Sequence, residues 1–316
     1  MGAIYAHMTL SQKAPKTTAQ LRASPRPTRR NVDLLSPTPR LSAAGAGRWR
    51  CADGGRQHQP IRRQDLLGLR GASGMMAAVV VRRLAELVHV DGPAWPLLAD
   101  RLAAATVPVR VVEADREAAA DCLYRLQVTV GSVLGALAFN TGGVFIDHGW
   151  LRLLGSGGAG LADVATTNEL RDPADAVAPP SYLVIGHDIV GGRFAVNGGA
   201  LPGDPGEVHY WGPDTLQWQP LGLGHAGLVE WALSGGTAEF YASLRWPGWQ
   251  AEAEQVAGDQ GVALYPPPFT REGRDPANVS RSVVPWPEIV GAYDEFSRQV
   301  AELAPGAQFR VQITDH

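Results

Sequence analysis

Cysteine is scarce in this chain of 316 residues, which holds only Cys51 and Cys122. Two cysteines cannot form the framework of several disulfides that stabilises small secreted domains, and they lack the spacing of a cysteine zinc site. Cys122 falls on the inward face of a predicted helix, so we expect a buried and unreactive thiol. A disulfide-bonded secreted domain is therefore not indicated.

Long apolar runs are also missing. No stretch approaches the ~20 apolar residues that a membrane-spanning helix needs, and the apolar segment 75–81 runs directly into Arg82 and Arg83. A charged segment followed by an apolar core, the pattern of a secretory signal, is not found either. We therefore expect a cytoplasmic protein without a membrane partner.

Motifs for catalysis are few. The chain has neither the G-x-S-x-G turn of α/β-hydrolases nor the H-E-x-x-H helix of zinc proteases. The run 155–160, GSGGAG, fits the glycine pattern of a dinucleotide-binding loop. Because the segments on both sides of it look like β-hairpins rather than a βαβ unit, we interpret it as a loop. The sequence predicts neither a bound cofactor nor a bound metal.

Charge divides the chain into two unlike parts. Of the 28 Lys and Arg and the 31 Asp and Glu residues, 13 and 3 lie before position 75, which leaves 15 and 28 after it. The net charge is thus +10 for residues 1–74 and −13 for the rest. The basic part is rich in Arg, Pro, Ser and Gly, a composition typical of disorder. We predict that residues 1–75 are a disordered extension or follow from a mis-assigned start; a transit peptide and a nucleic-acid-binding arm are the alternatives.

Residues 76–316 are predicted to form a single acidic α+β domain. Apolar residues at helical spacing predict helices over 81–88, 93–102 and 118–126, and an alternating segment predicts a strand over 107–114. From residue 131 to about 220, apolar runs between Asn-, Asp- and Gly-containing turns predict a central antiparallel sheet of hairpins. The part from about 224 is predicted to be helical, over 225–235, 237–258 and 287–303, before a last strand over 308–313.

Histidine and aspartate meet at two of the predicted turns. His148 follows Asp147, and Asp188 follows His187; an imidazole beside a carboxylate can bind a metal or share general acid–base work. The spacing fits no ligand motif, and aspartates in turns commonly accept backbone N–H groups. Asp147, His148 and Asp188 are therefore the candidate catalytic residues of an alternative hypothesis, a metal-dependent or acid–base enzyme.

Tryptophan is abundant, and eight of the nine tryptophans follow position 75. Large amphipathic rings fill cores, and they are also favoured at protein interfaces. The segments YWGPDTLQW and RWPGW predict a binding surface made of Trp211, Asp214, Trp218, Trp246 and Trp249, with core packing as the alternative. Arg152 and Arg245 lie close to tryptophans in the sequence, where a guanidinium can stack on a ring or pair with a carboxylate, a structural ion pair being the alternative.

Three long segments carry a resemblance to a known family. They are LQVTVGSVLGALAFNTGGVFIDHGWLRLLGSG, VNGGALPGDPGEVHYWGPDTLQW and FYASLRWPGW. They resemble an uncharacterised bacterial family, domain-of-unknown-function family 2625, over about residues 77–288. This resemblance implies no particular activity, and the first 74 residues lie outside it.

The order of the hairpins is similar to a second group, the SUKH superfamily, through Asp188, Gly192, Phe194, Gly206, Val208 and Trp231. This resemblance implies a SUKH-like fold and a protein partner, since many SUKH domains are thought to be immunity proteins that neutralise toxins. A net charge of −13 suits a basic partner, because complementary fields speed association. We predict a non-catalytic protein-binding module of the immunity or regulatory kind, whose partner is a protein such as a toxin rather than nucleic acid. A structural interaction domain without a toxin is the third alternative.

Overall fold

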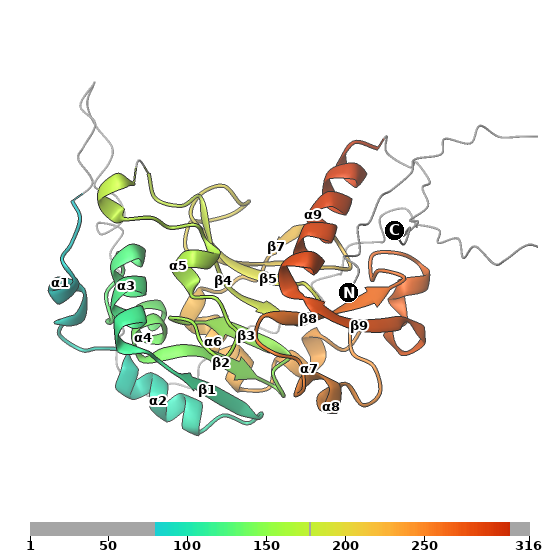
Figure 1. Ribbon diagram of the computed structural model, residues 1–316, viewed down its shortest axis with the longest axis horizontal. Helices are drawn as coiled ribbons and strands as arrows, with labels where there is room; N and C mark the ends of the chain where they lie inside the picture. The colour runs from blue at the N-terminus through green and yellow to red at the C-terminus, as the bar shows by residue number, and fades with distance from the viewer. Residues whose placement is uncertain (1–79, 177, 304–316) are drawn as a thin grey trace, which may run out of the picture. The chain divides into compact units, whose positions relative to one another are not determined.

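The computed structural model describes residues 80–176 and 178–303, and the elements below all belong to one folded unit (Figure 1). The predicted extension over residues 1–75 and the predicted strand over 308–313 lie outside the described residues.

The central sheet is antiparallel, and its seven strands pair in chain order. They are β1 (Val109–Glu113), β2 (Thr141–Ile146), β3 (Leu151–Leu154), β4 (Tyr182–Asp188), β5 (Arg193–Asn197), β6 (Val208–Trp211) and β7 (Trp218–Pro220). A separate two-stranded sheet contains β8 (Gln260–Tyr265) and β9 (Ser280–Pro285). The α+β class and the antiparallel sheet of hairpins are confirmed.

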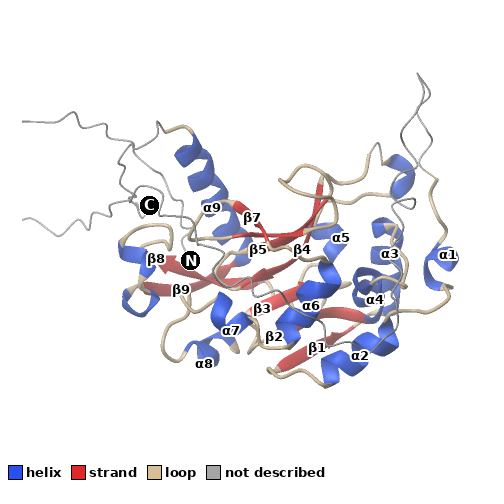
Figure 2. Ribbon diagram, turned by 180° about the vertical axis from the view of Figure 1, so that it is seen from behind, coloured by secondary structure: helices blue, strands red, loops and turns tan. Residues whose placement is uncertain are grey.

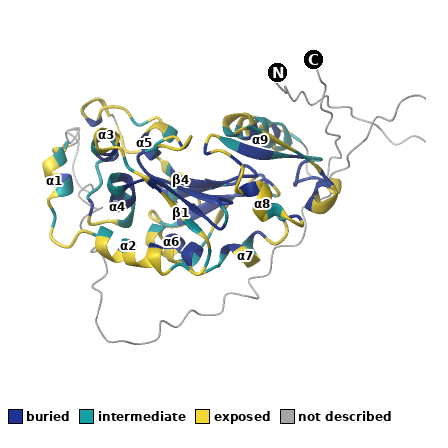
Figure 3. Ribbon diagram, turned by 60° about the horizontal axis from the view of Figure 1, so that its bottom comes forward, coloured by how far each residue is buried: buried dark blue, intermediate teal, exposed yellow. Residues whose placement is uncertain are grey.

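The helices surround this sheet (Figure 2). They are α1 (Leu84–Val88), α2 (Trp95–Ala103), α3 (Arg116–Leu126), α4 (Val133–Asn140), α5 (Val164–Thr167), α6 (His225–Leu233), α7 (Thr237–Phe240), α8 (Trp249–Ala253) and α9 (Trp286–Ala301). Figure 3 shows α2, α6 and α7 on one face of the buried strands, and α3, α5 and α9 on the other.

Alternation along the strands gives each face of the sheet its own core. Val144 and Ile146 of β2 share a core with apolar residues of α2 and α6. Phe145, between them, points to the opposite face, where it shares a core with residues of α3 and α5. A third apolar cluster forms between β6 and α9, around Trp211 and Tyr293. The second face is therefore covered in two separate places, one by α3 together with α5 and the other by α9.

Local sequence explains several element boundaries. The carboxylate of Asp115 accepts the backbone N–H groups of Glu117 and Ala118 at 3.0 and 2.9 Å, which caps α3. The turn between β2 and β3 has positive φ at Asp147 (54°), His148 (59°) and Gly149 (80°). Aspartate, histidine and glycine tolerate this left-handed region better than most residues, so the hairpin predicted there forms at the expected turn.

Three sequence predictions about secondary structure are wrong. The run 133–140 is the helix α4, not a strand: Ser132 caps it, and the helix is buried along 135–138, so its apolar pattern shows no helical period. The helix predicted over 237–258 is split into α7 and α8, because Pro247 and Gly248 (φ 81°) interrupt it. The part after 224 also contains the sheet of β8 and β9 rather than helices alone.

Candidate functional site

Asp188 is fully buried at the turn between β4 and β5. Its Oδ1 accepts the N–H groups of Val190 and Gly192 at 3.0 and 2.8 Å, and its Oδ2 accepts the hydroxyl of Tyr210 at 2.7 Å. Burial nevertheless raises the pKa of Asp188, since desolvation outweighs these hydrogen bonds. Asp188 therefore caps its turn, as expected for an aspartate there.

Asp147 forms a buried ion pair. Its Oδ2 lies 2.5 Å from the guanidinium of Arg245 and 2.6 Å from the hydroxyl of Thr237, and the Asp147 and Arg245 side chains are each 9% exposed. The guanidinium also lies 3.8 Å from the ring centre of Trp249 and 5.0 Å from that of Trp150. The pair fixes the β2–β3 turn to the segment between α7 and α8.

Tyr241 lies between the two aspartates. Its ring centre is 5.4 Å from the Arg245 guanidinium, and its side chain is fully buried. Burial, followed by the charge of Asp188, raises the pKa of Tyr241 well above its ordinary value. Asp147 and Asp188 thus belong to one buried cluster at the same end of the sheet.

His148 is the candidate catalytic residue that remains accessible. Its side chain is 27% exposed, its Nδ1 lies 2.5 Å from Oε1 of Glu254, and its ring meets Trp249 edge-on at 5.7 Å. It lines a pocket of about 310 Å³ together with Arg110 and Phe145, which we call the β1 pocket. Glu254, just after α8, was not singled out from the sequence, because 106 positions separate it from His148.

A row of cations and aromatic rings crosses one face of the sheet. Its members are direct cross-strand partners, one on each strand: Arg110, Phe145, Arg152, His187, Arg193, Trp211 and Trp218. Opposed residues of antiparallel strands project to the same side, so these side chains form one continuous line. We call this line the cation–aromatic row.

The middle of the cation–aromatic row is covered. Arg152 is fully buried, and its guanidinium donates to the carbonyl groups of Gly149, Val256, Gly258 and Gln260 at 2.5–3.3 Å. Burial, and then the charge of Arg110, lowers the pKa of Arg152 to about 10, so it is still a cation at neutral pH.

His187, the neighbour of Arg152 in the row, is also covered. Its ring stacks on Trp286 of α9 at 4.1 Å. Burial, and then the charge of Arg152, lowers the pKa of His187 to about 3. The ring is therefore neutral at neutral pH.

The far end of the row opens into a groove of about 470 Å³ between β5–β7 and α9, which we call the α9 groove. Arg193 lies 4.5 Å from the ring centre of Trp211 and 5.8 Å from that of Trp218. Its guanidinium also binds both carboxylate oxygens of Asp294 on α9, at 3.2 and 2.7 Å. Tyr182, 38% exposed, meets Trp218 at 5.5 Å on the rim.

The structure divides the predicted binding surface between two places. Trp211 and Trp218 lie together in the α9 groove, where Trp211 is 3% exposed and Trp218 is half-buried, and Asp214 is exposed in the turn between them. Trp246, 2% exposed, and half-buried Trp249 lie instead beside the Asp147 cluster.

Sequence reasoning missed Arg110, Tyr182, Arg193 and Asp294. The one signal that pointed to the row is Arg152, a charged residue between the leucines of LRLL, where strand burial leaves no place for an unpaired cation.

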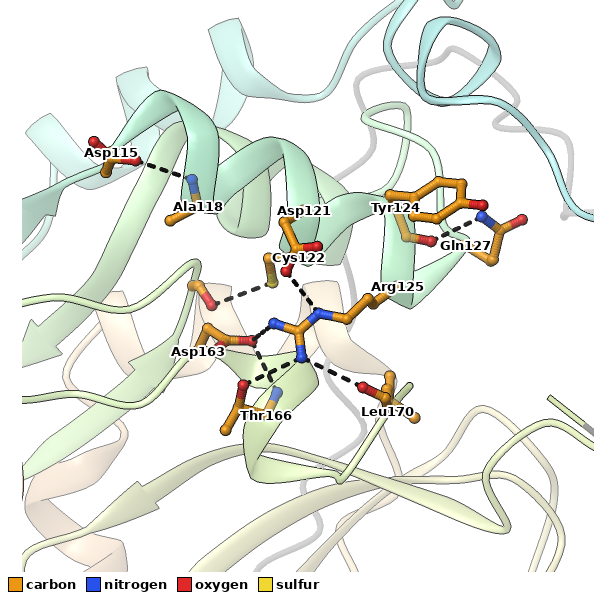
Figure 4. A network of polar contacts seen from close by, with 11 residues as sticks. Asp115, Ala118, Asp121, Cys122, Tyr124, Arg125, Gln127, Asp163, Thr166 and Leu170 are labelled. Atoms are coloured by element: carbon orange, nitrogen blue, oxygen red, sulfur yellow. Dashed lines mark hydrogen bonds and ion pairs between the residues drawn. The ribbon is translucent and has the colours of Figure 1, made fainter. Parts of the chain in front are cut away.

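The glycine-rich run GSGGAG joins β3 to α5, and Figure 4 shows the polar contacts of Arg125 with Asp163 and Leu170 nearby. Arg125 of α3 holds this region: its guanidinium contacts Asp163, the N-cap of α5, at 3.0 Å, and the carbonyl of Leu170 at 3.3 Å. Burial raises the pKa of Cys122 to about 12, and its Sγ faces the Gly155 carbonyl at 3.8 Å. The run is thus a loop, and Cys122 is a buried thiol, as predicted.

Two further kinds of feature are missing from residues 80–176 and 178–303. No three His, Cys, Asp or Glu side chains of these segments are grouped so that they would hold a metal ion. None of the described helices has the length and hydropathy needed to cross a bilayer.

Comparison with known proteins places the chain among uncharacterised bacterial proteins. YbfG, an uncharacterised protein of Escherichia coli (strain K12), is 36% identical over 191 residues, which are 59% of this chain and 85% of that protein. An uncharacterised protein of Haemophilus influenzae (strain Rd) is 32% identical over 190 residues, 59% of this chain and 82% of the relative. No solved structure matches the chain, and the likeness to the SUKH superfamily stays a prediction. Residues 84–289 match the family described as "Protein of unknown function DUF2625", and the chain belongs to this family.

Proposed function

We propose that the chain is a non-catalytic protein-binding module of the immunity or regulatory kind, and that it takes its partner at the α9 groove. The observation that carries this proposal is the position of Arg193, between two tryptophan rings and Asp294 at the open end of the cation–aromatic row. Tryptophan, tyrosine and arginine dominate the binding energy of protein interfaces, and the groove presents all three.

The edge of the sheet supports the same location. β7 is the last strand in the order of the central sheet, and it is only three residues long. A sheet edge offers unpaired N–H and C=O groups to an extended segment of another chain, while neighbouring pockets take up its side chains. Trp218 belongs to this edge strand, and its ring contacts that of Tyr182 on β4, so the two rings provide an aromatic surface for such a side chain.

Charge supports a basic partner. Residues 75–316 have a net charge of −13, and a partner of opposite sign would be steered toward them at low ionic strength. A basic toxin, the partner implied by the SUKH resemblance, meets this condition. Steering predicts that the association rate falls as salt is added, while the dissociation rate, set by contacts in the groove, changes less.

A site-specific photocrosslinker in the full chain tests this location. A crosslinking residue replaces Ser297, which lines the α9 groove, or Leu97, which is 66% exposed on α2 and serves as the control. We expect one protein from native lysate to crosslink at position 297 and not at position 97. The same products at both positions, or none at position 297, would contradict the proposed surface.

The second candidate function is an acid–base enzyme, favoured by the 2.5 Å contact between His148 and Glu254 beside the β1 pocket. A carboxylate that orients an imidazole is a common arrangement for a general base. If the chain turns over a substrate, His148→Asn should abolish that activity. Asparagine tolerates the left-handed backbone at this position. Retained turnover in this variant would exclude His148 as the base.

A further inference from the structure

We infer that the β1 pocket binds a small organic anion, a carboxylate or phosphate ester carried on a planar or apolar body. The pocket is about 310 Å³ in volume, which is at the small end of the range for ligand sites. Pro108, Val109 and Val256 supply apolar walls, and Phe145 supplies an aromatic one. This site is separate from the α9 groove, so the inference does not rest on the proposed function.

Positive charge gathers at this pocket without a bound carboxylate. The Arg110 guanidinium lies 3.8 Å from the ring centre of Phe145, and that of Arg152 lies 5.3 Å from the same ring. Neither arginine has an ion pair within residues 80–176 and 178–303, although residues 75–316 carry a net charge of −13. The guanidinium of Arg152 is bound by four carbonyl groups, so Arg110 is the cation of this pocket that is free to bind an anion.

The carboxylates nearest the pocket are already engaged. Glu254, which lines the mouth, contacts His148 at 2.5 Å. Asp147, next to His148 in the chain, is held by Arg245 and Thr237 in the buried ion pair. Asp188 and Asp259 act on the buried Arg152, and Glu254 is the acidic residue of the pocket lining, so its charge opposes the binding of an anion.

Arg110 has the geometry to recognise an oxyanion. A guanidinium that stacks on a ring keeps its N–H donors in its own plane, where they can bind two oxygens of one carboxylate or phosphate. Arg110 is exposed, so its N–H groups are reachable from solvent. The apolar walls of the pocket would contact the rest of the ligand, a planar or apolar body that packs beside Phe145.

Binding of benzoate and phenyl phosphate to the full chain tests this inference, with benzyl alcohol as the uncharged probe. We expect saturable shifts of the Phe145 and Gly149 amide signals in NMR spectra with at least one of the two anions and none with benzyl alcohol. Arg110→Gln should weaken anion binding by about 10- to 100-fold, the value of a charge-assisted hydrogen bond. Arg116→Gln is the matched control, because Arg116 is also exposed and its change removes the same charge.

A variant that is expected to bind more tightly shows that a change in affinity does not come from loss of the fold. Glu254→Gln removes the opposing charge from the mouth of the pocket, and we expect tighter binding of the same anions. Equal affinities in wild type, Arg110→Gln and Arg116→Gln would overturn the inference. So would the absence of saturable binding of either anion in both wild type and Glu254→Gln.

Discussion

The guanidinium of Arg193 lies 4.5 Å from the ring centre of Trp211, its direct cross-strand partner. Arg193 also binds Asp294 on α9, 101 positions further along the chain. The ring of Trp211 meets Tyr293 of the same helix at 5.9 Å. One arginine and one tryptophan therefore fix the helix to the sheet and, on their outer side, line the α9 groove.

The two tryptophans of the α9 groove are expected to respond differently to substitution. Trp211→Ala removes a ring that is 3% exposed and should lower the free energy of unfolding by about 3–5 kcal/mol. Trp218→Ala removes a half-buried ring at the sheet edge and should lower the free energy of unfolding by less. Urea denaturation of both variants checks this order, and an equal loss of stability would contradict the division between core and rim.

The buried ion pair is predicted to be costly to break. Asp147→Asn keeps the size and the left-handed backbone of the residue but leaves Arg245 without its counter-charge. We expect the free energy of unfolding to fall by about 3–5 kcal/mol, the usual cost of an unpaired buried charge. Asp294→Asn is the control, since Asp294 is 54% exposed and water can take its place at Arg193, so the loss of this ion pair should cost less than the loss of the Asp147 pair. Similar losses of unfolding free energy in both variants would show that burial does not make the Asp147–Arg245 pair more important for stability than the exposed pair.

Arg152 is predicted not to tolerate lysine. A lysine ammonium has three donors at one point, and it cannot reach four carbonyl groups arranged around a planar guanidinium. Arg152→Lys should therefore leave at least one buried carbonyl unpaired and lower the free energy of unfolding by about 1–3 kcal/mol. Thermal and urea unfolding measure this loss, and wild-type stability in the variant would disprove the role of the four carbonyl contacts.

His225 is predicted to make the domain sensitive to acid. The residue is half-buried overall, yet both ring nitrogens are buried and find no partner in the described part of the chain. Burial lowers the pKa of His225 from 6.5 to about 4. Because the folded pKa is the lower one, the stability linked to this neutral ring is fully present above pH 6.5 and is lost as the pH falls toward 4.

Replacement of this ring tests the linkage. His225→Leu should raise the free energy of unfolding at pH 7 by about 1 kcal/mol, since it removes an unpaired buried polar ring. Between pH 6.5 and 4 the variant should lose less stability than wild type. His187, whose pKa burial lowers to about 3, stays in both proteins and cancels in the comparison. Parallel pH profiles of wild type and variant would contradict this assignment.

Turn chemistry made part of the fold predictable from the sequence. Asp147, His148 and Gly149 form the predicted turn, and Asp188 accepts backbone N–H groups as a turn aspartate commonly does. These features depend on neighbours within a few positions. The apolar run 133–140 was not decidable, because a short buried segment has no period that separates helix from strand.

The cation–aromatic row was not predictable, since it depends on register across all seven strands of the sheet. A slip of one residue at any turn would send a side chain to the other face. Register shifts at Val112/Glu113 and Val184/Gly186 add offsets that strand patterns do not reveal. Arg152 could be flagged as a cation in a buried strand, but its alignment with Phe145 and His187 required the structure.

The most direct test of the proposed binding function measures how tightly the protein identified by crosslinking binds three forms of the full chain. These are wild type, Trp218→Ala and Trp95→Ala, the last a half-buried tryptophan on α2 that is remote from the α9 groove in sequence. With folding confirmed by equal unfolding midpoints of the two variants, Trp218→Ala is predicted to weaken binding at least about tenfold, and Trp95→Ala to leave it unchanged. Equal affinities for all three forms would contradict the assignment of the α9 groove as the binding site.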